Sequence, residues 1–212
     1  MKSDSAGKIL PVFLSVMIGC LLAACATVRI PSEIGEEVTA TSYGRQRDEK
    51  GVVIMSINWS RKWGCGGFEN AELRSISFDL LPPRKFEDGI SPDIQINGPP
   101  RLMTTPLFKD YVLLVRPGEY ALSGFEIKVA RSISEGGYHT ARRSDLLEDG
   151  EPSGGTFKIE AGETVYIGHF FVGCASPPLL WRYYTEGQEG FKKFLDGIKM
   201  QYPFLDLHKT QF

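Results

Sequence analysis

Alternating apolar and polar positions, which are typical of half-buried β-strands, dominate the chain between residues 51 and 172. The stretch 76–80 alternates most cleanly and predicts a strand with one face in a core. Two other runs, 111–115 and 164–172, are apolar on both faces and predict central strands. This part of the chain therefore predicts a sheet-rich domain.

The hydrophobic period changes in the tail. Apolar residues recur at helical spacing between 191 and 198, with lysines elsewhere on the wheel. Thr185 and Gln188 just before them have the spacing of a capping box. We therefore predict a mainly β fold, an antiparallel β-sandwich at 51–212 that ends in a short C-terminal α-helix.

Local signals add detail to the strands. Arg116-Pro117-Gly118-Glu119 has the composition of a type II turn. The apolar phase of the next strand is even at Tyr120 and Leu122 but odd from Phe125 onwards. Such a slip at Ser123-Gly124 predicts a β-bulge or a bend.

Three segments read as irregular. Residues 81–109 are rich in proline and contain one candidate strand at 93–96, whereas 132–155 is a long polar loop. The glycine-rich stretch 63–68 predicts a loop with unusual backbone angles.

The N-terminus is apolar from 9 to 22 and ends in Leu22-Ala23-Ala24-Cys25. The apolar run is short for a membrane span, which needs roughly 20 residues. Leu22-Ala23-Ala24-Cys25 resembles the lipobox of bacterial lipoproteins. The resemblance implies a signal peptide at 1–24 and lipid chains on Cys25, with Met17-Ile18-Gly19-Cys20 as a poorer second candidate. An ordinary signal peptide followed by an incidental cysteine is the alternative.

The resemblance to lipoproteins also implies a location. Ala26 would follow the lipidated cysteine, and the absence of aspartate there favours the outer membrane, facing the periplasm. We expect residues 25–50 to form a polar tether, part of which could dock as an edge strand at 38–41. The membrane is then one partner of the protein, through Cys25.

Cysteine usage is consistent with export. Cys65 and Cys174 remain once Cys20 and Cys25 are assigned to the leader and the lipid. An even remainder in an oxidising compartment predicts one disulfide, although two separate buried thiols are the alternative. Two cysteines are too few for a zinc site of the CxxC kind. The formal net charge of −2 does not indicate the basic surface with which proteins bind nucleic acid.

Two turn-and-strand phrases, 115–122 and 159–168, carry a second resemblance. They are similar to bacterial lipoproteins and periplasmic domains with a transthyretin-like or carboxypeptidase-regulatory-like β-sandwich, which use a Pro-Gly-x-Tyr turn between strands. The resemblance covers 111–172. It implies a structural or binding module with no cofactor and no catalytic residues to carry over.

Histidines are the residues to weigh for an enzyme. His139 and His208 fall in polar segments, whereas His169 lies in the central strand, on the face of Val165, Ile167 and Phe171. The simpler interpretation is that His169 is a buried histidine whose ring is hydrogen-bonded by a neighbour. The alternative is that it acts as a general base or as a ligand. No metal-ligand spacing, nucleophile elbow or phosphate loop is present in the sequence.

Binding candidates come from aromatic and basic residues. The composition of an interface hot spot is found in the segment Trp181-Arg182-Tyr183-Tyr184. The alternative is that these side chains only pack the C-terminal helix against the sheet. Arg142 and Arg143 are candidate ligand-binding residues in a loop that is otherwise solvated. We expect a non-enzymatic envelope lipoprotein that binds or assembles with another envelope protein. The alternative is a periplasmic hydrolase acting on envelope material, with a site near His139 or His169.

Overall fold

The computed structural model describes residues 36–81, 91–99, 108–132, 134–207 and 210. The predicted signal peptide at 1–24, Cys25, the first part of the predicted tether and His208 lie outside these residues. In the part that is described, no helix is long and apolar enough to cross a membrane.

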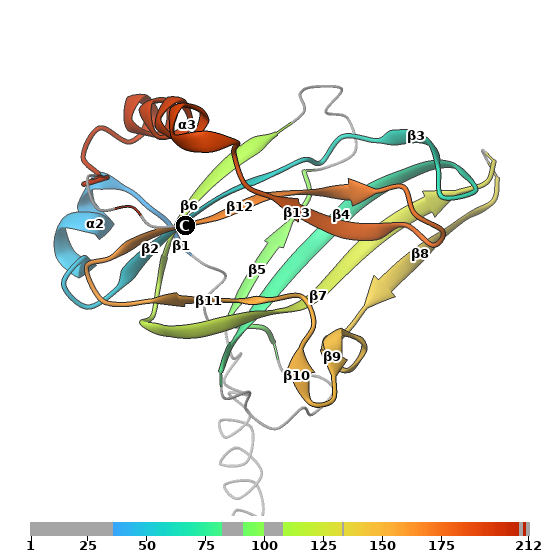
Figure 1. Ribbon diagram of the computed structural model, residues 1–212, viewed down its shortest axis with the longest axis horizontal. Coiled ribbons are helices and arrows are strands. Elements are labelled where there is room, and N and C mark those ends of the chain that lie inside the picture. Colours follow the sequence, from blue (N-terminus) through green and yellow to red (C-terminus); the bar gives the residue numbers. More distant parts are fainter. Residues whose placement is uncertain (1–35, 82–90, 100–107, 133, 208–209, 211–212) are drawn as a thin grey trace, which may run out of the picture. The chain divides into compact units, whose positions relative to one another are not determined.

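A five-stranded sheet, here called the mixed sheet, forms one layer of the fold (Figure 1). Its order is β1 (Glu36–Glu37), β6 (Lys109–Val115), β2 (Gly51–Ile57), β12 (Thr164–Gly173) and β13 (Leu179–Tyr183). β12 runs parallel to β2, whereas the other pairs are antiparallel. The prediction of a wholly antiparallel fold is therefore wrong for this sheet. Parallel neighbours need a crossover connection, and here the chain between β2 and β12 passes through the second sheet.

The second layer, here called the antiparallel sheet, is built on the long pair of β4 and β7. Its strands are β3 (Lys62–Cys65), β4 (Phe68–Leu81), β5 (Ile94–Asn97), β7 (Gly118–Ala130), β8 (Gly136–Ala141) and β11 (Thr156–Ile159). β3 and β5 pair with β4, while β8 and β11 pair with β7. At the predicted turn 116–119 the chain only bends at Pro117, and β7 already begins at Gly118. This connection carries the chain from one sheet to the other, because β6 and β7 belong to different sheets.

The main core lies between the two sheets. Every second residue of β2 enters it, at Val53, Met55 and Ile57, and Ile76 and Phe78 of β4 face them from the antiparallel sheet. Burying a side chain of this size contributes about 1.5–3 kcal/mol. The two layers therefore hold together as a β-sandwich, as the alternating pattern predicted.

A second core explains why the central strands are apolar on both faces. Val52 and Ile54 of β2 point away from the sandwich and pack under α2 (Ala40–Gln46) and α3 (Gly187–Gln201). Figure 1 shows both helices beside the mixed sheet. Ile198 of α3 and Leu205 beyond it are fully buried there. The predicted C-terminal helix is confirmed, and it covers the sheet.

Residues 36–50 differ from the expected tether. They form β1, which pairs with β6, and α2 instead of an edge strand at 38–41. Thr39 starts this helix, because its hydroxyl accepts from the Ser42 N–H at 3.0 Å while the Ser42 hydroxyl accepts from the Thr39 N–H at 2.9 Å. The apolar side chains of Val38 and Tyr43 then dock on the mixed sheet.

The cap expected for α3 also differs. Glu186 is its N-cap and makes no side-chain capping bond. Thr185 hydrogen-bonds to the Tyr166 phenol instead, through both its backbone and its hydroxyl. Its hydroxyl thus anchors the start of the helix to β12.

The phase slip at Ser123-Gly124 is a β-bulge, as predicted. Ser77 pairs with Gly124 and Phe78 pairs with Leu122, so Ser123 is an extra residue on β7. The long segment 132–155, in contrast, is more ordered than a polar loop. It holds β8, the 3-10 helix η1 (Arg143–Leu146), and the hairpin of β9 (Leu147–Glu148) and β10 (Glu151–Pro152).

The predicted cysteine pair is confirmed at disulfide distance. The sulfur atoms of Cys65 and Cys174 are 2.12 Å apart. Cys65 ends β3 in the antiparallel sheet, and Cys174 follows β12 in the mixed sheet. Gly64, Gly66 and Gly67 around Cys65 have positive φ, as their sequence indicated. The bridge thus ties the two layers together.

Candidate functional site

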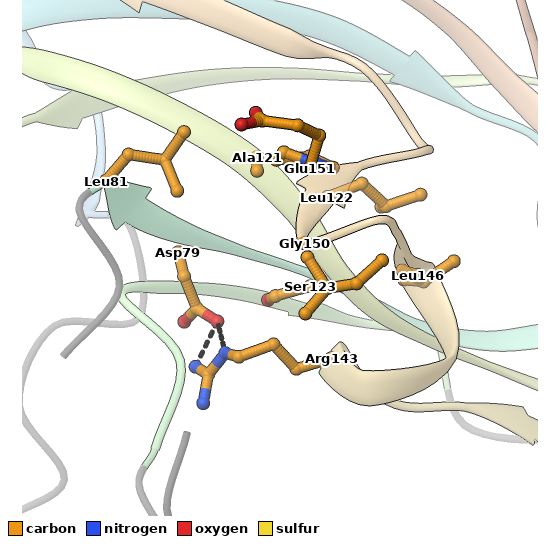
Figure 2. Close-up of a pocket in the computed structure, with 11 residues that line it drawn as sticks. Asp79, Leu81, Ala121, Leu122, Ser123, Arg143, Leu146, Gly150 and Glu151 are labelled. Atoms are coloured by element: carbon orange, nitrogen blue, oxygen red, sulfur yellow. Dashed lines mark hydrogen bonds and ion pairs between the residues drawn. The ribbon is translucent and has the colours of Figure 1, made fainter. Parts of the chain in front are cut away.

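A cavity of about 330 Å³ lies where η1, β9 and β10 meet the antiparallel sheet (Figure 2). We call residues 143–152 the flap. The cavity is lined by Asp79, Leu81, Ala121, Leu122, Ser123, Arg143, Leu146, Leu147, Gly150, Glu151 and Pro152. Most of these side chains are apolar. The sheet forms one wall and the flap the other.

The bulge at Ser123 shapes the sheet wall. Bulges re-aim side chains, and this one brings Ser123 into the lining beside Ala121 and Leu122. Ser123 is buried, and its hydroxyl lies 3.4 Å from that of Ser77. The sequence signal at 123–124 therefore marked a wall of the cavity.

One ion pair joins the flap to the sheet. Figure 2 shows Arg143 of η1 reaching Asp79 of β4, and its Nε and Nη2 both contact Asp79 Oδ2. The side chains are only 20% and 7% exposed, so the charges are largely removed from water. A buried charge that loses its partner is costly, which means that this contact holds the flap in place.

Asp79 also belongs to a wider polar network. The Asp93 N–H donates to Asp79 Oδ1 at 3.4 Å, and the Leu80 N–H donates to Asp93 Oδ2 at 2.9 Å. Asp93 Oδ1 in turn accepts from Arg116 Nη2 at 2.6 Å. These contacts fix the Asp79 carboxylate from the sheet side, so it offers Arg143 a preorganised partner.

The lining is mostly apolar, and its polar side chains are those of Asp79, Ser123, Arg143 and Glu151. The residues that line the cavity in the described structure include no histidine, cysteine or lysine. Ser123 has another serine as its polar neighbour rather than a base. An apolar pocket with a few polar groups at fixed places is typical of ligand sites.

The basic candidates from the sequence separate in space. Arg143 lines the cavity, whereas Arg142 is exposed and its N–H donates to Asp145 at 2.8 Å at the start of η1. The sequence did not point to Asp79 or Leu146. Asp79 could have been noticed as a carboxylate in a strongly apolar strand.

His169 lies on the opposite face from the one predicted. Three residue steps on β12, from Tyr166 to His169, match two steps on β2, from Ile54 to Ser56. Gly168 within this bulge has a φ of 104°. Val165 and Ile167 therefore face the sandwich core, whereas His169 lies on the helix side with Tyr166.

Aromatic rings enclose His169. Its ring stacks on Tyr183 at 4.9 Å and contacts Phe194, Phe108 and Tyr166 at 5.1, 5.2 and 5.7 Å between centroids. The residue is 8% exposed. This surround favours the simpler interpretation of a packed histidine over that of a general base. His139, the other candidate, is half-buried on β8 near Phe125.

Polar groups meet His169 at the edge of these rings. Burial lowers the pKa of His169, and the Asp110 carboxylate, which accepts from Ser56, partly opposes this shift. Burial raises the pKa of Tyr166 to about 12, so its hydroxyl stays protonated and can donate to His169 Nδ1. Protonation of Nδ1 would convert this acceptor into a second donor.

We expect acid to destabilise the fold through His169. Because the folded-state pKa lies below the usual 6.5, stability is full above that value and falls as the pH drops through the folded pKa. Urea unfolding between pH 7.5 and 5.5 measures this loss. His169→Phe should flatten the profile. Equal profiles for the two proteins would contradict the assignment.

The aromatic candidates lie on and after β13. Trp181, Tyr183 and Tyr184 are 51%, 43% and 41% exposed. Tyr183 contacts His169 and Tyr184 contacts Tyr166 under α3, as expected if these tyrosines pack the helix against the sheet. Arg182 turns to the other face of β13, against Gly155 and Gly168. Packing of the helix against the sheet does not account for the exposed Trp181.

Metal chemistry finds no support among the described residues, where no group of three or more His, Cys, Asp or Glu side chains could hold an ion. The apolar lining and the buried Asp79–Arg143 pair remain the features on which a function can be based. Comparisons with protein-family models, curated proteins and solved structures found no match for the chain.

Proposed function

We propose that this chain is a lipid-anchored protein of the bacterial cell envelope whose folded domain binds a small apolar ligand without transforming it. Cys25 would carry the lipid and place the domain at the outer membrane, facing the periplasm. The Cys65–Cys174 pair supports an oxidising compartment. The cavity under the flap is the observation that carries the binding role.

Three properties of the cavity support this role. Its volume of about 330 Å³ falls in the range of small-molecule sites. Leucines from both walls, Leu122 of the sheet and Leu146 of the flap, would cover an apolar ligand. Asp79 and Arg143 form an ion pair with each other, so the cavity does not need a charged ligand to neutralise either of them.

Filling the cavity should weaken the binding of an apolar probe. We expect the neutral dye N-phenyl-1-naphthylamine to bind the protein with enhanced fluorescence, and Ala121→Phe to weaken its affinity at least tenfold. Ala121 is 5% exposed and lines the cavity, so the added ring occupies ligand space.

Ala40→Phe is the matched control, because Ala40 is exposed on α2 and outside the cavity lining. It should bind the dye as the unaltered protein does. Equal dye binding by the Ala121→Phe protein, at unchanged stability, would show that the cavity is not the ligand site.

The anchor has a separate test. Mass spectrometry of the membrane fraction should find the N-terminal peptide beginning at Cys25 with acyl chains attached, and Cys25→Ser should release the protein from the membrane. An unmodified N-terminus at Cys25 or elsewhere would contradict anchoring and leave the ligand site unaffected.

A further inference from the structure

The exposed side of β13 is apolar, which reverses the usual pattern of a surface strand. Leu179, Trp181 and Tyr183 are 41%, 51% and 43% exposed, whereas Leu180 and Arg182 are half-buried on the other face. The Trp181 indole lies against Gly173, where a Cβ atom would collide with it. The strand therefore presents a fixed apolar row to its surroundings.

β13 is also the last strand of the mixed sheet within the described residues. One side of it pairs with β12, and the other side has backbone N–H and C=O groups that can pair with a further strand. The strand contains no proline and no lysine, which are residues that commonly block such pairing. An edge of this kind accepts a partner strand.

We propose that the partner is a second copy of the chain, paired antiparallel through β13 about a two-fold axis at Trp181. Trp181 is the middle residue of the five in β13. A two-fold axis there places Trp181 opposite Trp181 of the second copy, and Leu179 opposite Tyr183. The two mixed sheets then form one continuous sheet.

The sequence of β13 is complementary to itself in this register. Leu179, Trp181 and Tyr183 meet apolar residues on the exposed face, where aromatic and aliphatic cross-strand pairs stabilise a sheet. On the other face Arg182 lies opposite Leu180 of the second copy, so the two arginines are not opposed. Trp and Tyr at the centre are the residue types that dominate interface energies.

This self-complementarity distinguishes a second copy from other occupants. A foreign strand would need a matching apolar row of its own, and a membrane surface would leave the backbone groups of the edge unpaired. The two-fold register satisfies the apolar row, the charges and the backbone groups together. It also makes a prediction for single residues.

Engineered cysteines test the register in the full chain, expressed in cells and analysed by non-reducing electrophoresis of the membrane fraction. Directly opposed residues in antiparallel strands have Cα atoms about 4.5–5.5 Å apart, within the range of disulfides. Trp181→Cys should therefore form a covalent homodimer. Leu179→Cys is the matched control on the same face, because its copies would lie about 13 Å apart along the strands. We expect at least tenfold more dimer for the first variant.

The oligomeric state provides a second measurement. Trp181→Glu should convert the detergent-solubilised protein from dimer to monomer in light scattering, because two carboxylates would oppose each other. Trp63→Glu is the control, since Trp63 is 65% exposed but lies on β3. A retained Cys65–Cys174 bridge in each variant would show that it is folded.

Three results would overturn the proposal. They are a monomeric unaltered protein, equal crosslinking at 179 and 181, and crosslinking of the Trp181→Cys variant to a different protein only. None of these results affects dye binding in the cavity. Failure of the dimer proposal can therefore be distinguished from failure of the proposed function.

Discussion

Arg143→Met should lower the free energy of unfolding by about 3–5 kcal/mol, the usual effect of removing one partner of a buried ion pair. The reason is that the Asp79 carboxylate, whose side chain is 7% exposed, loses its guanidinium partner. The flap should also detach from the sheet, so that affinity for an apolar dye falls with stability. Urea unfolding and dye titration measure the two effects.

Removing both charges separates the cost of the unpaired carboxylate from the value of the pair. The double variant Asp79→Leu/Arg143→Met should recover most of the lost stability, because neither charge of the pair is left without its partner. Lys192→Met serves as the control, since it breaks an exposed pair with Asp196 and should change little. If the double variant is as unstable as the single one, the pair is not what Arg143 contributes.

Loss of the disulfide is the second large effect that we expect. Replacing Cys65 and Cys174 with alanine opens a loop with a sequence separation of 109. In the chain-entropy model this lowers stability by about 4–5 kcal/mol through the unfolded state. Cys65 is fully buried, so small cavity losses add to the effect.

The reduced form of the unaltered protein is the matched control for the double variant. Its denaturant midpoint should fall nearly as far, because both lack the same cross-link. If reduction and substitution each leave the midpoint in place, the two layers are held by packing and the bridge contributes nothing.

The strands were predictable because apolar period and burial coincide along most of the sandwich. Apolar residues on both faces of 164–172 indicated that β12 is a central strand. The change in apolar alternation at 123–124 indicated the bulge at Ser123. The cysteine pair followed from counting. These signals are local, or depend on two residues alone.

The features that were missed depend on contacts distant in sequence or on small backbone shifts. The extra residue in β12 reverses the face of His169, and a strict period of two does not anticipate it. The cavity needs Asp79 and Arg143, which are 64 residues apart. The parallel pairing of β2 with β12 has no local signal at all.

The family resemblance stays a prediction. The connection at 116–119, which carries part of the resemblance, joins strands of different sheets, and helices cover one face of the mixed sheet. The anchor at Cys25 and the envelope location likewise remain proposals with their own test.

The parallel pairing of β2 and β12 has a consequence for the growing or exported chain. β2 is synthesised on the order of a hundred residues before β12, yet it is buried on both faces in the final sheet. Long-range pairing of this kind is slow and leaves apolar surface open to aggregation in the meantime. During that interval the apolar segment Gly51–Ile57 lacks the strand that later pairs with it along one edge.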